Sequence, residues 1–126
     1  MADKKRILVI DDEADFGWFL KLNLEGSGLY EVRCEKNGEA GIAAVAGFKP
    51  DLILLDIAMP GLDGYQTSEQ LRKNPSSKNI NILFLTGKEL LPSKIAERCQ
   101  GFGRCDFINK PFMLDVLLKK IQEFTT

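Results

Sequence analysis

Three short stretches of uninterrupted apolar residues constrain the fold of this chain more than any other feature of its sequence. They occupy residues 7–10, 52–55 and 82–85, and polar or small residues follow each of them. Apolar runs of this length are typical of β-strands that are buried on both faces of a parallel sheet. We therefore predict three interior strands with helices covering both sides of the sheet.

The remaining segments alternate regularly with these strands. Residues 30–34 and 105–108 carry charges among apolar residues, and both stretches are predicted to be edge strands. Helical spacing of apolar residues or helix-boundary residues predict helices at 14–27, 38–48, 65–73, 92–100 and 112–124. Five strand–helix repeats with right-handed crossovers favour the flavodoxin-like doubly wound (βα)5 fold, with a parallel sheet of order 2-1-3-4-5. We expect a single domain over residues 1–126.

Charge and composition exclude several classes of protein. Seventeen basic and 18 acidic residues give a net charge of −1, which argues against a general nucleic-acid or membrane-surface binder. No apolar run approaches the roughly 20 residues of a membrane-spanning helix, and no signal peptide is evident, so a cytoplasmic location is expected. The absence of histidine excludes Ser–His and Cys–His catalysis. Three cysteines without a C-x-x-C pair argue against a disulfide framework.

Chemically reactive side chains follow the predicted strands at their carboxyl ends. Asp11 and Asp12 follow the first strand, Asp56 the third, Thr86 the fourth and Lys110 the fifth. Ligands of such sheets bind at this edge, and the first and third strands are neighbours, so we expect the three aspartates to share a crevice. Their mutual repulsion favours protonation of one acid or binding of a cation, and an oxygen-only ligand set favours Mg²⁺.

This combination of groups is typical of phosphoryl transfer. A carboxylate, a divalent cation, a lysine and a hydroxyl are the components that such a reaction requires. Asp56 is a credible nucleophile because carboxylates form aspartyl phosphates. Gly87 would leave room beside it for a phosphoryl group.

Four motifs occur in order at the strand ends: Ile-Leu-Val-Ile-Asp11-Asp12-Glu13, Leu-Leu-Asp56-Ile-Ala-Met59-Pro60-Gly61-Leu-Asp63-Gly64, Thr86-Gly87 and Phe107-Ile-Asn-Lys110-Pro111-Phe112. Together they resemble the receiver domain of two-component response regulators over essentially the whole chain. The resemblance implies that Asp56 accepts a phosphoryl group from a phosphohistidine on a histidine kinase or histidine phosphotransfer protein. It also implies a Mg²⁺ site formed by Asp12 directly, Asp11 mainly through water, Asp56, and the backbone carbonyl of Ala58.

The resemblance assigns roles to further residues. Lys110 and the Thr86 hydroxyl would each hold a phosphoryl oxygen, and a cis peptide is implied at Lys110–Pro111. Thr86 and Phe107 would act as switch residues that reshape the surface of helix 4, strand 5 and helix 5 for a downstream protein or output domain. Ala58 and Lys88 occupy positions that tune loss of the phosphate. The implied module catalyses only its own phosphorylation and dephosphorylation, binds no nucleic acid directly and does not insert into membranes.

Other interpretations remain open at this point. A flavin-binding electron carrier shares the fold, but Asp-Asp-Glu stands where it needs a phosphate-binding loop. An aspartate-nucleophile phosphatase of the dehalogenase type needs a second acid two residues after the nucleophile, where this chain has Ala58. A docking module that is never phosphorylated is the third alternative. Phe107 is equally consistent with an aromatic core residue on an edge strand.

Overall fold

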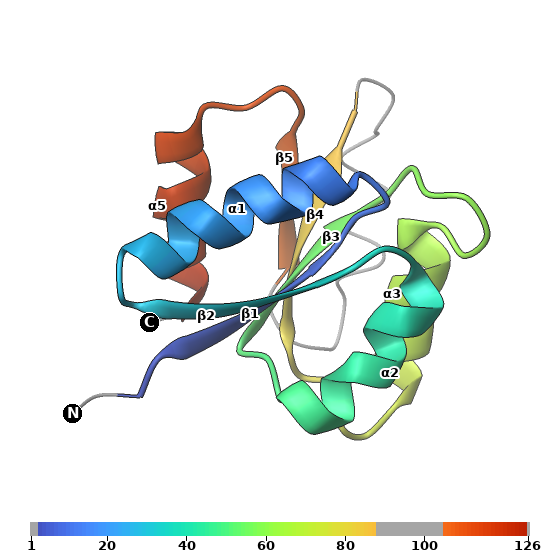
Figure 1. Ribbon diagram of the computed structural model, residues 1–126. Helices are drawn as coiled ribbons and strands as arrows, with labels where there is room; N and C mark the ends of the chain where they lie inside the picture. The colour runs from blue at the N-terminus through green and yellow to red at the C-terminus, as the bar shows by residue number, and fades with distance from the viewer. Residues whose placement is uncertain (1–2, 88–104, 126) are drawn as a thin grey trace.

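Strands and helices alternate along the chain in the computed structural model, which describes residues 3–87 and 105–125. The elements are β1 (Lys5–Ile10), α1 (Ala14–Gly26), β2 (Tyr30–Glu35), α2 (Gly38–Phe48), β3 (Leu52–Asp56), α3 (Gly64–Lys73), β4 (Asn81–Thr86), β5 (Cys105–Asn109) and α5 (Leu114–Thr125) (Figure 1). The helix predicted at 92–100 lies outside the described residues. Every other predicted element is present, with bounds that shift by one to a few residues.

The five strands form one parallel sheet of order β2-β1-β3-β4-β5, which confirms the predicted topology. β2 and β5 are the edge strands, as their charged residues indicated. Ile10 of β1 lies opposite Leu55 of β3 in the register. Asp11 and Asp56 each follow one of these paired residues, so the register alone places the two acids side by side.

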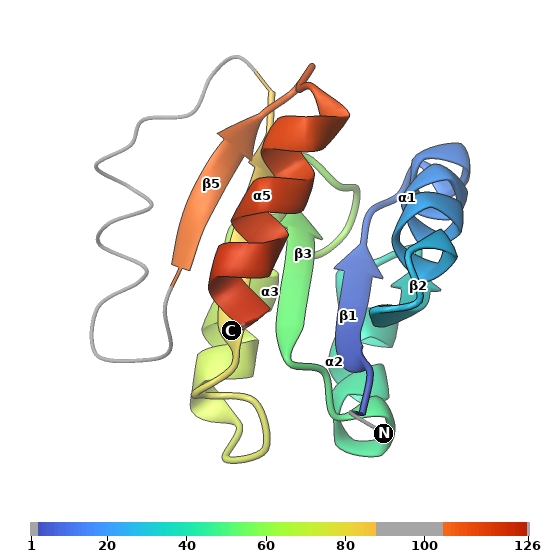
Figure 2. The same ribbon diagram turned by 90° about the vertical axis from the view of Figure 1, so that its left-hand side faces the viewer.

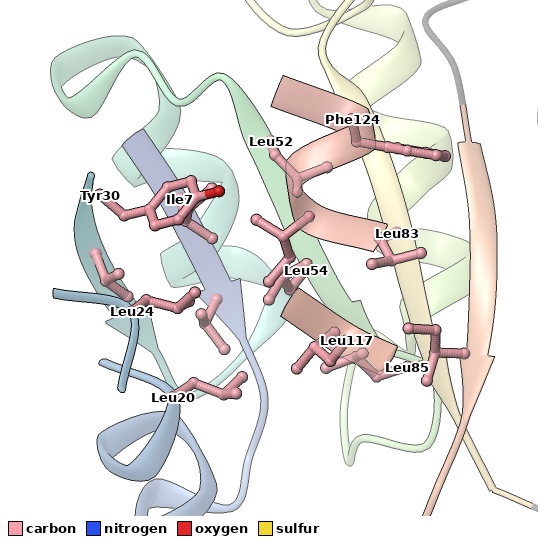
Figure 3. Packing of buried hydrophobic residues seen from close by; sticks show 14 residues of the cluster. Ile7, Leu20, Leu24, Tyr30, Leu52, Leu54, Leu83, Leu85, Leu117 and Phe124 are labelled. Atoms are coloured by element: carbon pink, nitrogen blue, oxygen red, sulfur yellow. The ribbon is translucent and has the colours of Figure 1, made fainter. Parts of the chain in front are cut away.

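Helices cover the sheet on both faces, with α1 and α5 on one side and α2 and α3 on the other (Figures 1 and 2). Successive residues of a strand point to opposite faces, so each interior strand supplies both layers. Leu52 and Leu54 face α1 and α5 (Figure 3). Ile53 and Leu55 face α2 and α3. All four are fully buried, which explains why the runs contain no polar residue.

Two details differ from the expectations. Phe19 recurs at the helical spacing of the apolar residues in 14–27, yet it is 47% exposed, because α1 buries the stripe of Gly17, Leu20 and Leu24. Cys105 is disulfide-bonded, although the cysteine pattern argued against a disulfide framework, and Cys34 is a free thiol. No helix among the described residues is long and apolar enough to cross a membrane.

Candidate functional site

Three aspartates meet at the carboxyl ends of β1 and β3. Asp56 is the last residue of β3, and Asp11 and Asp12 follow β1 directly. One carboxylate oxygen from each lies within 4.8 Å of the other two. Asp11 and Asp56 are buried, whereas Asp12 is exposed. The three aspartates therefore come together as strand order predicted, with one of them facing solvent.

Lys110, which follows the edge strand β5, brings a positive charge to these acids. Its Nζ donates a hydrogen bond to Asp11 Oδ2 at 2.8 Å and lies 3.7 Å from Asp56 Oδ1. A third carboxylate oxygen, Glu13 Oε1, lies 3.6 Å from the same nitrogen. One ammonium thus faces three carboxylates, and the side chain that carries it is only 21% exposed.

Backbone contacts hold both partners of this ion pair in place. The backbone N–H of Glu13 donates to Asp11 Oδ1 at 2.9 Å, which leaves Asp11 Oδ2 to accept from Lys110. The backbone N–H of Lys110 donates to the carbonyl of Thr86, so the ends of β4 and β5 are joined beside the site. The Lys110–Pro111 peptide is cis, as the sequence resemblance implied.

The pKa of Asp56 is raised to about 7. Burial is the largest cause, since it disfavours the charged form, and the negative charge of Asp11 acts in the same direction. The ammonium of Lys110 opposes these effects, and the Asp12 carboxylate adds to them. Near neutral pH the crevice therefore holds a carboxyl group that titrates between its neutral and charged forms.

The pKa of Lys110 is raised as well. Burial by itself would lower it, but the hydrogen bond and charge of Asp11, with the charges of Asp56 and Glu13, outweigh burial. The lysine is therefore fully charged at neutral pH. A permanent cation in a half-buried site is suited to binding anionic oxygens.

The loop that leaves β3 is anchored at its far end by the start of α3. Asp63 and Gln66 form a reciprocal capping box there. A Cβ at Gly64 would lie 2.4 Å from the carbonyl oxygen of Asp56, so only glycine permits this approach. Ala58 lies exposed within the loop, and the assignment of its carbonyl as a metal ligand stays a prediction.

Of the expected switch residues, Thr86 ends β4 and Phe107 lies within β5. The Thr86 hydroxyl is buried at the end of β4 and donates to the carbonyl of Gly87 at 3.1 Å. Phe107 is partly buried and packs against the core layer beneath α2 and α3, opposite Phe84 in the register. Lys88 lies outside the described residues. Roles for Thr86, Phe107 and Lys88 in switching or tuning remain predictions.

The acid cluster has the chemistry of a hard-cation site. Its three carboxylates offer only oxygen ligands, and two of them are buried with more negative charge than Lys110 alone balances. Mg²⁺ is commonly held by one or two carboxylates, with its remaining positions left to water and phosphate. The residues present therefore fit this ion.

One contact at the site was missed by reasoning from the sequence. Lys110 Nζ lies 4.5 Å from the centroid of the Phe16 ring, which in turn packs edge-on against Phe112 at 5.6 Å between centroids. In the sequence, Phe16 recurs at the helical spacing of the apolar residues in 14–27, a pattern that predicts only packing against the core. No sequence signal links Phe16 to Lys110, because α1 and the end of β5 meet only after the sheet has formed.

Comparisons with known proteins agree with this geometry. Residues 7–122 match the family model described as the response regulator receiver domain. The chain is 36% identical to protein PilH of Pseudomonas aeruginosa, over 92% of this chain and 93% of PilH. It is 34% identical to the DNA-binding dual master transcriptional regulator RpaA of Synechocystis, over 93% of this chain but 47% of RpaA. The chain thus spans about half the length of RpaA and nearly all of PilH.

Solved structures show the same fold. The chemotaxis protein CheY4 of Vibrio cholerae superimposes with a TM-score of 0.84 at 26% identity, covering 97% of this chain and 99% of that one. The N-terminal domain of a response regulator receiver protein from Methanoculleus marisnigri gives a TM-score of 0.75 at 32% identity, with 94% of both chains covered.

Proposed function

The chain belongs to the response regulator receiver domain family, and from that premise we propose that Asp56 is the phosphoacceptor of a signalling switch. The observation that carries this proposal is the pairing of a buried acid cluster with the Lys110 ammonium, 3.7 Å from Asp56 and 2.8 Å from Asp11. Receiver domains are phosphorylation-activated switches, and Asp56 is the acid of this cluster that ends β3.

The proposed reaction moves a phosphoryl group from nitrogen to oxygen. A carboxylate oxygen of Asp56 forms a bond to phosphorus while the bond from phosphorus to the donor's imidazole nitrogen breaks. The electron pair of that bond stays with the imidazole, which then takes up a proton. The switch returns to its unphosphorylated state by hydrolysis. Water attacks the phosphorus of the aspartyl phosphate, which releases inorganic phosphate and restores the Asp56 carboxylate.

The other residues of the site have separate roles in the proposed transfer. Asp11, Asp12, Asp56 and the carbonyl of Ala58 would hold Mg²⁺, which when bound supplies positive charge that favours the ionised, nucleophilic form of Asp56. Lys110 binds one phosphoryl oxygen as charge develops during transfer. The Thr86 hydroxyl, by turning away from the carbonyl of Gly87, becomes free to bind another.

The proposal extends to partners and output. The donor is a histidine kinase or a histidine phosphotransfer protein in the cytoplasm, and residues 1–126 act as one receiver domain. Movement of Thr86 and Phe107 would alter the surface around β5 and α5 that a downstream protein or output domain contacts. The chain binds no nucleic acid itself and catalyses only its own phosphorylation and dephosphorylation.

Small-molecule phosphodonors test this proposal without knowledge of the kinase. Phosphoramidate carries a phosphorus–nitrogen bond like that of phosphohistidine, and with Mg²⁺ it should add one phosphoryl group to the full chain, measured as a mass shift. Hydroxylamine, which attacks acyl phosphates, should remove the label. Asp56→Asn should abolish labelling, while Asp51→Asn, at the opposite end of the sheet, should label normally. A label that persists in Asp56→Asn would refute Asp56 as the acceptor.

A further inference from the structure

We propose that Phe16 is a positioning residue for Lys110, holding its ammonium beside Asp56 through a cation–π contact with the ring face. This inference rests on the proposed function, since it concerns how the lysine that binds the phosphoryl group is kept in place. It assigns a role in phosphoryl transfer to an aromatic side chain of α1 that is neither an acid nor a hydrogen-bond partner.

The geometry of the contact is well within the range of a cation–π interaction. Lys110 Nζ lies 4.5 Å from the centroid of the Phe16 ring, and such contacts are effective to about 6 Å. The same nitrogen also donates to Asp11 and faces Asp56 and Glu13. The ammonium is therefore held by carboxylates and by an aromatic ring in the same conformation.

The ring itself is fixed by the fold. Phe16 is partly buried and packs against the core layer under α1 and α5. Phe112, two residues after Lys110, packs edge-on against it, with 5.6 Å between the ring centroids and an angle of 70° between the planes. Phe16 thus connects α1 to the segment that carries the lysine, and its position depends on both.

An open space beside the lysine explains why a positioning residue is needed. A cavity of about 490 Å³ borders the site, and Phe16, Lys110 and Phe112 line it together with Gly87. A lysine side chain has four rotatable bonds and gives up about 2 kcal/mol of conformational freedom when it is held in one geometry. Without the aromatic ring, the ammonium gains conformations that point into this space and away from Asp56.

The inference predicts a specific electronic dependence. Fluorine atoms added to a phenylalanine ring withdraw electron density from its face while changing its size little. Replacing Phe16 by phenylalanines carrying successively more fluorine should therefore slow Mg²⁺-dependent labelling by phosphoramidate in graded steps. Phe16→Leu should label about fivefold more slowly than wild type, and Phe16→Tyr should stay near the wild-type rate.

A matched control separates this effect from simple packing. Phe19→Leu removes a ring from the same helix and the same cavity lining, and it leaves the Phe16–Lys110 contact in place. This variant should label at the wild-type rate. Equal rates across the fluorinated series, or labelling of Phe16→Leu at or above the wild-type rate, would overturn the proposed role.

A second measurement is independent of phosphorylation. In the unphosphorylated protein, the methylene protons of Lys110 next to Nζ should resonate upfield because of the Phe16 ring current. Phe16→Leu should lose this shift, and Phe16→Tyr should keep it. If wild type takes up no phosphoryl group at all, the proposed function fails. If wild type labels but the ring-current shift is absent or unaffected by Phe16→Leu, the positioning role alone fails.

Discussion

Charged side chains at the two ends of the parallel sheet differ in burial and in how fully they are paired. At the amino end, Arg6 is 44% exposed along its side chain and its groups are matched with partners. Its backbone N–H donates to Asp51 Oδ2 at 2.8 Å, and its guanidinium contacts the carbonyl of Phe48 and the carboxylate of Glu31. At the carboxyl end, buried Asp11 and Asp56 crowd around the single ammonium of Lys110.

The contrast shows which charges serve stability and which do not. Exposed, matched pairs at the amino end need no further partner, because water and the opposite charge satisfy them. At the carboxyl end, burial raises the pKa of Asp56 to about 7, and the negative charge of Asp11 adds to this effect. Keeping ionised carboxylates buried and close together costs stability, and the same crowding of carboxylates would attract a cation.

The largest expected effect comes from removing negative charge at the carboxyl end. The double variant Asp11→Asn, Asp12→Asn should label with phosphoramidate about a thousandfold more slowly, which corresponds to about 4 kcal/mol of activation free energy. Asp51→Asn removes one carboxylate from the amino end and should label at the wild-type rate. Similar rates for the two proteins would show that the two ends are not functionally distinct.

A second effect concerns the stability of the Mg²⁺-free protein as a function of pH. The folded pKa of Asp56, about 7, lies above its ordinary value of 3.8, so the folded state binds more protons than the unfolded state between these limits. Wild-type stability should therefore fall as pH rises from about 4 to about 7. Asp56→Asn, which does not ionise, should exceed wild type by about 4 kcal/mol at pH 8.

Urea unfolding at pH 5 and pH 8, with EDTA present, measures this difference. The gap between Asp56→Asn and wild type should be widest at pH 8 and less than half as large at pH 5. Glu31→Gln, at the amino end, provides the comparison, since it leaves the acids at the carboxyl end unchanged. An identical pH dependence of stability in wild type and Asp56→Asn would contradict the raised pKa.

Mg²⁺ should stabilise the folded protein through the same acids. At a free concentration ten times the dissociation constant, a ligand that binds only the folded state adds about 1.4 kcal/mol. Thermal unfolding of wild type should therefore shift upward with Mg²⁺, and the shift should grow from pH 5 to pH 8 as Asp56 ionises. The double variant Asp11→Asn, Asp12→Asn should show no shift, and an equal shift there would place the cation elsewhere.

The smallest effect is expected at the amino end. Glu31→Gln removes the Arg6–Glu31 ion pair, whose atoms lie 3.5 Å apart on side chains that are 44% and 53% exposed. Exposed pairs of this kind contribute about 0.2–1 kcal/mol and are weakened by salt. The free energy of unfolding should fall by no more than this amount, and the loss should vanish in 1 M salt. A loss above about 2 kcal/mol would contradict the small contribution expected of this exposed ion pair.

Much of the fold and the location of the site were predictable from local sequence. The apolar runs at 52–55 and 82–85 are long enough to identify buried strands, and turn residues separate them from the helices. The acids and the lysine directly follow strands, so strand order was sufficient to bring them to one edge. The exposure of Phe19 was not predictable, because Gly17 and not a large residue occupies the buried stripe of α1.

Local sequence determined that this chain forms a parallel sheet with acids and a lysine at its carboxyl edge, because strand and helix periodicities are properties of neighbouring residues. Tertiary structure alone decided that Lys110 pairs with Asp11 at 2.8 Å and lies over the Phe16 ring, and that burial shifts the pKa of Asp56. These properties depend on distances between segments that are remote in sequence and on the exclusion of water by packing. No single segment of the chain determines either of them.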